Sequence, residues 1–167
     1  THLNFNQHAK EFGKFGGYAY LKTIIDKLRH DANDHALLLD GGDTWQGSGL
    51  SLLTNGMDMV GASNILGVDV MTGHWEFTYG EKIFLENLKK FNGDFVAQNI
   101  SLTEEALFDG IEPVDENNHF QEPYVIKTIN KQRVAVIGQA FPYTPIANPS
   151  RLIPNLTFGI RDNDLQE

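Results

Sequence analysis

A chain of 167 residues with 41% hydrophobic and 21% charged residues has the composition of a folded globular protein, which argues against disorder of the whole. Its formal net charge of −9 argues against nucleic acid as the main partner, because phosphate binding needs a basic face. The absence of cysteine excludes disulfides, thiolate zinc sites and a cysteine nucleophile, so His, Asp, Glu or Asn would have to hold any metal. No apolar run reaches the length of about 18 residues that predicts a membrane span.

Helical and strand-like patterns alternate along the chain after a polar start at 1–14, which is expected to be a loop. The acidic segment 101–119 could hold a short strand but is expected to be mainly loop, and the proline-rich segment 139–145 is expected to be a rigid loop. The polar end at 162–167 resembles the opening of a helix. In chain order, the predicted elements are a helix at 18–29, a strand at 36–39, a helix at 58–66, a strand at 67–71, a helix at 81–90, a strand at 95–97, a hairpin of strands at 124–129 and 133–138, and a short strand at 156–160.

This succession predicts an α/β fold. Helices between successive strands imply right-handed crossovers and therefore a largely parallel sheet. The hairpin adds strands of opposite direction, so the expected sheet is mixed but largely parallel, with helices covering its faces. Both chain ends look cut, and we expect 1–167 to be part of a larger domain.

Two ionisable residues stand where predicted strands end. Asp43 closes the turn Asp40-Gly41-Gly42-Asp43 after the first strand, and His74 follows the strand that ends at Met71. Open α/β sheets place their chemistry at the carboxyl ends of strands, and neighbouring parallel strands end on one edge. Asp43 and His74 could therefore converge on one metal ion as half of a site. The alternative is an ordinary turn, because Asp and Gly are common turn residues.

Two blocks of sequence resemble the central motifs of the dinuclear metallophosphoesterases, and of their 5′-nucleotidase branch in particular. They read GGDTWQGS at 41–48 and GHWEFTYG at 73–80. The resemblance implies a four-layer, calcineurin-like α/β domain, of which 1–167 would be a partial catalytic domain truncated at both ends. It departs from the family at three positions: His74 replaces a metal-ligand Asn, Trp75 replaces a catalytic His, and Thr78 replaces the Asp that supports that His. The usual phosphatase electrostatics are therefore missing here.

These departures, together with the block VIGQAFPYTPIANP at 136–149, resemble the SoxB thiosulfohydrolase family of the bacterial Sox sulfur-oxidation pathway. The resemblance implies a periplasmic hydrolase with two divalent metal ions, Mn(II), which releases sulfate from a cysteine S-sulfonate on the carrier SoxYZ. Asp43 would bridge the two ions and His74 would ligate one of them. Trp75 and Gln139 would line the substrate site, although Trp75 could equally be core and Gln139 a turn residue. No catalytic side chain is assigned.

Two other functions stay open on the sequence. One is a 5′-nucleotidase-like phosphoesterase, against which Trp75 and Thr78 argue; the other is a non-catalytic α/β binding domain. The family resemblance also implies an Asp-x-His pair upstream and further His ligands downstream, which these 167 residues do not contain. We therefore expect the 167 residues alone to retain little metal and to be inactive. Glu76 is expected to be a structural hydrogen-bond acceptor rather than a catalytic acid.

Overall fold

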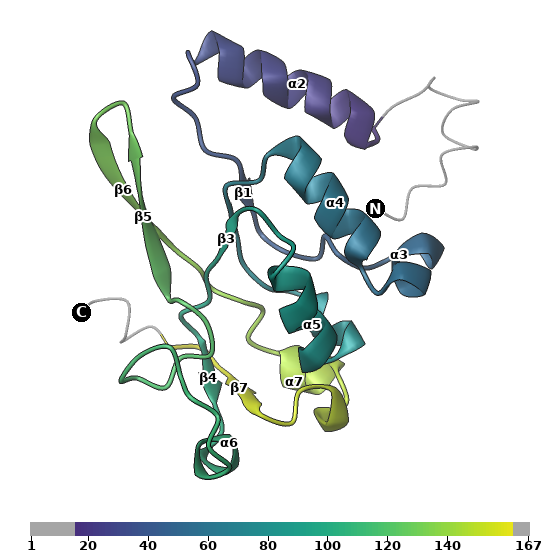
Figure 1. Cartoon of the computed structure of the whole chain (residues 1–167), viewed down its shortest axis with the longest axis vertical. Coiled ribbons are helices and arrows are strands. Elements are labelled where there is room, and N and C mark those ends of the chain that lie inside the picture. The colour runs from purple at the N-terminus through teal and green to yellow at the C-terminus, as the bar shows by residue number, and fades with distance from the viewer. Residues whose placement is uncertain (1–15, 162–167) are drawn as a thin grey trace.

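The computed structural model describes residues 16–161, so the predictions made for 1–14 and 162–167 lie outside the described residues. The described part has the predicted α/β architecture (Figure 1). In chain order its elements are α2 (Tyr18–Asp31), β1 (Leu39–Asp40), α3 (Gly49–Thr54), α4 (Met57–Leu66), β2 (Val70–Met71), the 3-10 turn η1 (Glu76–Tyr79), α5 (Glu81–Leu88), β3 (Asp94–Phe95), β4 (Ile100–Leu102), α6 (Glu104–Phe108), β5 (Tyr124–Ile129), β6 (Gln132–Ile137), α7 (Thr144–Ala147), the 3-10 turn η2 (Ser150–Leu152) and β7 (Leu156–Phe158).

A parallel sheet in the order β1-β2-β3 carries the candidate site. Leu39 pairs with Val70, and Met71 pairs with Phe95. The strands alternate with helices in the chain, and α4 and α5 lie together on one side of the sheet (Figure 1). The largely parallel sheet flanked by helices is therefore confirmed, and the carboxyl ends of β1 and β2 lie side by side.

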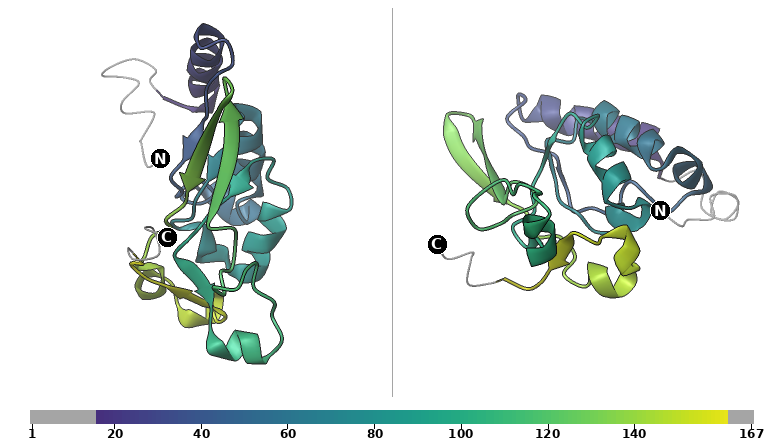
Figure 2. Two further views of the ribbon diagram at one scale, coloured as in Figure 1. Left: turned by 90° about the vertical axis from the view of Figure 1, so that its left-hand side faces the viewer. Right: turned by 60° about the horizontal axis from the view of Figure 1, so that its bottom comes forward.

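The hairpin β5–β6 forms a two-stranded sheet of its own, so the expectation that it extends the parallel sheet is wrong. Its base is tied to the segment after β3, where the Gln98 N–H donates to the Gly138 carbonyl over 2.8 Å, and Lys127 of β5 pairs with Asp94 of β3. At the base the two backbones approach so closely that a Cβ on Gly138 would lie 1.9 Å from the Val96 oxygen. Beyond the base the hairpin projects away from the sheet (Figures 1 and 2). Sequence periodicity identifies such strands but not the direction in which they leave.

The acidic segment, predicted to be mainly loop with room for a short strand, overlaps the short strand β4 and also contains the helix α6, which was not predicted. The Thr103 hydroxyl caps α6 by accepting the Ala106 N–H over 3.2 Å, and two acidic residues occupy its first turn. Both features stabilise a helix N-terminus. At five residues α6 is too short to show an apolar period, which is why the prediction missed it. Strand β4 pairs antiparallel with β7, whose predicted position is confirmed.

Aromatic side chains form the centre of the core beneath the sheet. The Phe84 ring lies 4.5 Å from that of Phe77, 5.0 Å from that of Phe95 and 6.1 Å from that of Trp45. Trp45 is fully buried and belongs to this core. No helix within residues 16–161 is long and apolar enough to cross a membrane.

Candidate functional site

The turn after β1 is held by the carboxylate of Asp40. This carboxylate accepts the Gly42 N–H over 3.0 Å and the Thr44 hydroxyl over 2.9 Å. Gly42 and Asp43 both have positive φ angles, 88° and 61°. A non-glycine residue in this region costs on the order of 1 kcal/mol and persists only where its surroundings hold it, often at functional sites. The result is an exposed Asp43 carboxylate, which also accepts a hydrogen bond from the Gln46 amide.

His74 follows β2 and presents a half-buried imidazole. Its ring stacks on Phe141 with centroids 4.5 Å apart and planes 27° apart. Among the described residues, Nδ1 of His74 is buried without a hydrogen-bond partner. Buried polar atoms are nearly always satisfied, so an orphaned imidazole nitrogen at a strand end fits a metal ligand.

The turns that carry Asp43 and His74 touch each other. A Cβ built on Gly42 would lie 2.7 Å from the backbone nitrogen of His74 and 2.9 Å from the carbonyl oxygen of Thr72. The predicted convergence of the two strand ends is thus present in the backbone. Glycine is required at position 42 both for its positive φ and for this close approach. The binding of metal by Asp43 and His74 stays a prediction.

Glu76 links the turn that carries Asp43 to the turn that carries His74 through hydrogen bonds. It is 1% exposed. One carboxylate oxygen accepts the N–H groups of Thr44 and Trp45 over 2.7 and 3.3 Å, and the other accepts the His74 N–H over 2.6 Å. The predicted role of a structural acceptor is confirmed by this geometry. A single buried carboxylate therefore sets the spacing between the strand ends.

The two residues predicted to line a substrate site differ in their surroundings. Trp75 is half-buried, with its ring centroid 6.1 Å from that of His74. Gln139 is exposed, and its amide donates to the Gln98 side chain over 3.4 Å. Trp75 therefore adjoins the candidate site, whereas the recorded contact of Gln139 is with the segment after β3. Contact of either residue with a substrate stays a prediction.

Two tyrosines near the Asp43 turn stay neutral over a wide pH range. Burial raises the pKa of Tyr18, and the negative charges of Asp40 and Asp58 raise it further. Burial also raises the pKa of Tyr79, with Asp58 adding to the effect. Both hydroxyls are therefore protonated at neutral pH.

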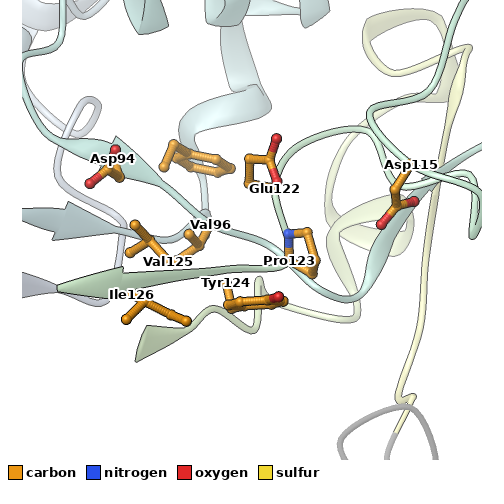
Figure 3. A pocket seen from close by; sticks show the side chains of 9 residues that line it. Asp94, Val96, Asp115, Glu122, Pro123, Tyr124, Val125 and Ile126 are labelled. Carbon is orange, nitrogen blue, oxygen red and sulfur yellow. The ribbon is translucent and has the colours of Figure 1, made fainter. Parts of the chain in front are cut away.

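A separate cavity of about 550 Å³ lies between β3 and the start of β5 (Figure 3). Its carboxylates are mostly engaged: Asp94 pairs with Lys127, and Asp115 hydrogen-bonds the His119 ring over 2.6 Å. Burial alone would raise the pKa of Asp115, but hydrogen bonds from the ring and backbone of His119 hold it below its usual value. None of the predicted site residues lines this cavity.

Residues 16–161 supply only part of a metal site. In this range no group of three or more His, Cys, Asp or Glu side chains is placed to hold a metal ion. Asp43 and His74 offer one carboxylate and one imidazole, donors that suit manganese or zinc. The donor set fits a metal that takes its remaining ligands from residues beyond those described, as the family resemblance implies.

No family model matches the chain, but known proteins resemble it in sequence and in fold. The snake venom 5′-nucleotidase of Gloydius brevicauda is 30% identical over 100% of this chain. The solved structure of sulfate thiohydrolase SoxB from Thermus thermophilus is 34% identical over 98% of this chain, with a TM-score of 0.81. By fold and by sequence the chain is 5′-nucleotidase-like.

One further solved structure, of lower identity, shows the same fold. The calcineurin-like phosphoesterase YfkN of Bacillus subtilis, 23% identical over 85% of this chain and 45% of its own, shares the fold with a TM-score of 0.65. The chain spans 28% of the length of the venom 5′-nucleotidase and 29% of the SoxB chain. The likeness therefore covers nearly the whole of this chain, including the turns that carry Asp43 and His74. The larger part of the venom enzyme and of the SoxB chain lies outside the matched region.

Sequence reasoning missed the residues that hold the 138–149 segment against the site. The buried Asn99 amide donates to the Ala140 carbonyl over 2.8 Å and accepts the Ala140 N–H over 2.7 Å. The fully buried Thr144 hydroxyl donates to the Phe141 carbonyl over 2.7 Å. An Asn directly after a strand was visible in the sequence, but its partner 41 positions away was not.

Substituting alanine for Gly42 in the full-length protein is expected to lower the free energy of unfolding by about 1–3 kcal/mol, because the new Cβ would force the His74 backbone away. The two turns would separate, and metal binding should weaken with stability. Thermal denaturation and metal analysis of the same sample would measure both effects.

Gly41→Ala is the matched control for that experiment. A Cβ on Gly41 meets nothing within 4 Å, and its φ is not positive. The control should stay within about 0.5 kcal/mol of the parent protein, as surface substitutions usually do. Equal losses in the two variants would contradict the close approach of the turns.

Proposed function

We propose that the full-length protein is a SoxB-type thiosulfohydrolase, which releases sulfate from a cysteine S-sulfonate on the arm of the carrier SoxYZ. The observation that carries the proposal is the pair Trp75 and Thr78 at the positions where the phosphoesterase motif has His and Asp. The Thr78 hydroxyl instead donates to Asn148 over 3.4 Å. The blocks 73–80 and 136–149, which both resemble the SoxB family, are thus joined by a hydrogen bond beside the candidate site.

Asp43 and His74 would hold two divalent metal ions, proposed as Mn(II), together with ligands outside the described residues. When bound, such ions activate a water molecule and neutralise the oxygens of an anionic substrate. Asp43 supplies a carboxylate that can bridge two ions, and His74 supplies a neutral nitrogen. Glu76 keeps the turns that carry these groups at a fixed spacing through its three hydrogen bonds.

The chemistry of the leaving group explains why the site can dispense with a histidine at position 75. In the proposed reaction the water oxygen bonds to the sulfonate sulfur, the S–S bond breaks, and its electron pair leaves with the cysteine sulfur as a thiolate. The two protons of the water pass to solvent, and sulfate is released. A thiol has a pKa of about 8.5, so its anion leaves without a proton donor. The alkoxide of a phosphate ester is far more basic and benefits from one. The Trp75 indole cannot supply that charged donor.

The proposal includes a cellular setting. Since the carrier-bound substrate belongs to the Sox pathway, the protein would work in the periplasm with SoxYZ as its macromolecular partner. A secreted relative, the snake venom enzyme, is compatible with a location outside the cytoplasm. Trp75 and Gln139 would contact the carrier arm, with Trp75 adjoining the His74 ring.

A second candidate is a 5′-nucleotidase-like phosphoesterase, favoured by the venom and bovine 5′-nucleotidases, which are 30% and 32% identical to this chain. The substitution at Trp75 opposes it, because loss of one transition-state donor costs about 10²–10³ in rate. A non-catalytic domain is the third possibility, and retention of both Asp43 and His74 at neighbouring strand ends argues against it.

Full-length protein loaded with Mn(II) is expected to hydrolyse S-sulfonated SoxYZ at least about 100-fold more efficiently than AMP, given the missing donor. Sulfate and phosphate release would be compared as kcat/KM under one set of conditions. A His74→Ala sample measured in parallel excludes a contaminating phosphatase. Equal efficiency with AMP would support the 5′-nucleotidase function, and inactivity on both substrates would support the non-catalytic one.

A further inference from the structure

We infer that Phe141 is a positioning residue for the His74 imidazole and thereby sets the metal affinity of the site. The inference rests on the proposed metal-binding role of His74. Phe141 lies in the loop after β6, far from His74 in the sequence, and no motif analysis assigns it a role. Its ring is stacked on the His74 ring, with centroids 4.5 Å apart and planes 27° apart.

The stack on Phe141 fixes the orientation of the His74 imidazole, which in other metal sites is usually fixed by a hydrogen bond. A metal-ligating histidine almost always donates its second ring N–H to a carboxylate or carbonyl, which fixes the ring plane and the tautomer. In the described part of the chain neither ring nitrogen of His74 has a hydrogen-bond partner, so a metal bound at the buried Nδ1 would leave the second nitrogen without one. The broad flat contact with Phe141 is therefore the interaction that restrains rotation of the imidazole about its χ2 angle.

Phe141 can act as a rigid reference because its own backbone is held on both sides. Its N–H donates to the Gly73 carbonyl over 3.0 Å, which anchors it to the residue before His74. Its carbonyl accepts the hydroxyl of the fully buried Thr144, and the neighbouring Ala140 is clamped at both backbone groups by the buried Asn99. Displacement of the Phe141 backbone, and with it the base of the ring, would have to break these bonds.

Tyr143 provides a matched control in the same loop. It is 52% exposed, and its ring packs edge-on against Phe141 at 5.8 Å. No ring contact between Tyr143 and His74 is present in the described part of the chain. Removing the Tyr143 ring therefore takes away an aromatic group from the loop but leaves the stack on His74 in place.

The test is a double-mutant cycle in the full-length protein, with Mn(II) affinity measured by titration and the free ion quantified by its EPR signal. Phe141→Leu keeps an apolar side chain but removes the ring, and should weaken Mn(II) binding about 10–100-fold, as loss of an orienting partner does. Phe141→Tyr keeps the ring and should restore the affinity to within about threefold. Tyr143→Leu should leave it unchanged. In a His74→Ala background, Phe141→Leu should have no further effect.

The outcomes separate this inference from the proposed metal site. Unchanged Mn(II) affinity in Phe141→Leu, or the same fold loss in the His74→Ala background, would overturn the role of Phe141 while leaving His74 a ligand. Unchanged affinity in His74→Ala itself would instead overturn the proposed ligand role. Melting temperatures recorded for each variant show whether a loss of Mn(II) affinity follows from unfolding. A loss caused by unfolding alone would not be rescued selectively by Phe141→Tyr.

Discussion

Glu76→Ala is expected to lower the free energy of unfolding of the full-length protein by about 3–5 kcal/mol, the upper range for single substitutions. Three backbone N–H groups, those of Thr44, Trp45 and His74, lose their acceptor at once. Each orphaned buried donor costs about 1–3 kcal/mol. Urea denaturation followed by tryptophan fluorescence would measure the change, because Trp45 is fully buried beside the broken contacts.

Two further variants make the Glu76 experiment specific. Glu76→Gln keeps one carbonyl oxygen but turns the other acceptor into a donor, so it should release one of the two turns and cost about half as much. Glu86→Ala removes an exposed carboxylate from α5 and should stay within about 0.5 kcal/mol of the parent protein. If Glu76→Ala were as mild as Glu86→Ala, the carboxylate would not be what joins the turns.

The position of the site could be predicted from the sequence because it follows from local rules. An apolar run that stops at Asp40-Gly41-Gly42-Asp43 is visible as a strand end, and so is the strand end before His74. The geometry of parallel sheets then brings the two ends to one edge. The contact between Gly42 and His74 is the physical result of that rule. Glu76 was expected to be a structural acceptor, but its three N–H partners on the two turns are known only from the structure.

Other features depended on contacts between segments far apart in the chain, which no local pattern records. The stack of Phe141 on His74 requires the loop after β6 to return to the sheet edge, and the sequence alone does not fix that path. The hairpin was predicted but its direction was not, because strand periodicity does not show which sheet edge, if any, a strand pairs with. Helix α6 was missed because five residues are too few for a period to appear.

His74→Ala is expected to weaken Mn(II) binding by the full-length protein by more than about 100-fold and to abolish S-sulfonate hydrolysis. Even partners that only orient a ligand change metal affinity by about 10–100-fold, and a ligand should matter more. The structure motivates this expectation through the buried Nδ1 that has no hydrogen-bond partner among the described residues. Metal content after dialysis, measured by mass spectrometry, would check it. His35→Ala is the control, because His35 is exposed in the loop before β1.

His74→Asn decides what the histidine contributes. The Asn side-chain oxygen is as many bonds from the backbone as Nδ1 of His, and the related phosphoesterase motif has Asn at this position. If His74 acts as a ligand through Nδ1, the Asn variant should keep its metal to within about tenfold, since both atoms are acceptable donors for manganese. Loss of metal in both variants would mean that the ring itself, held by Phe141, is needed. Retention in both would remove His74 from the metal site and favour the non-catalytic alternative.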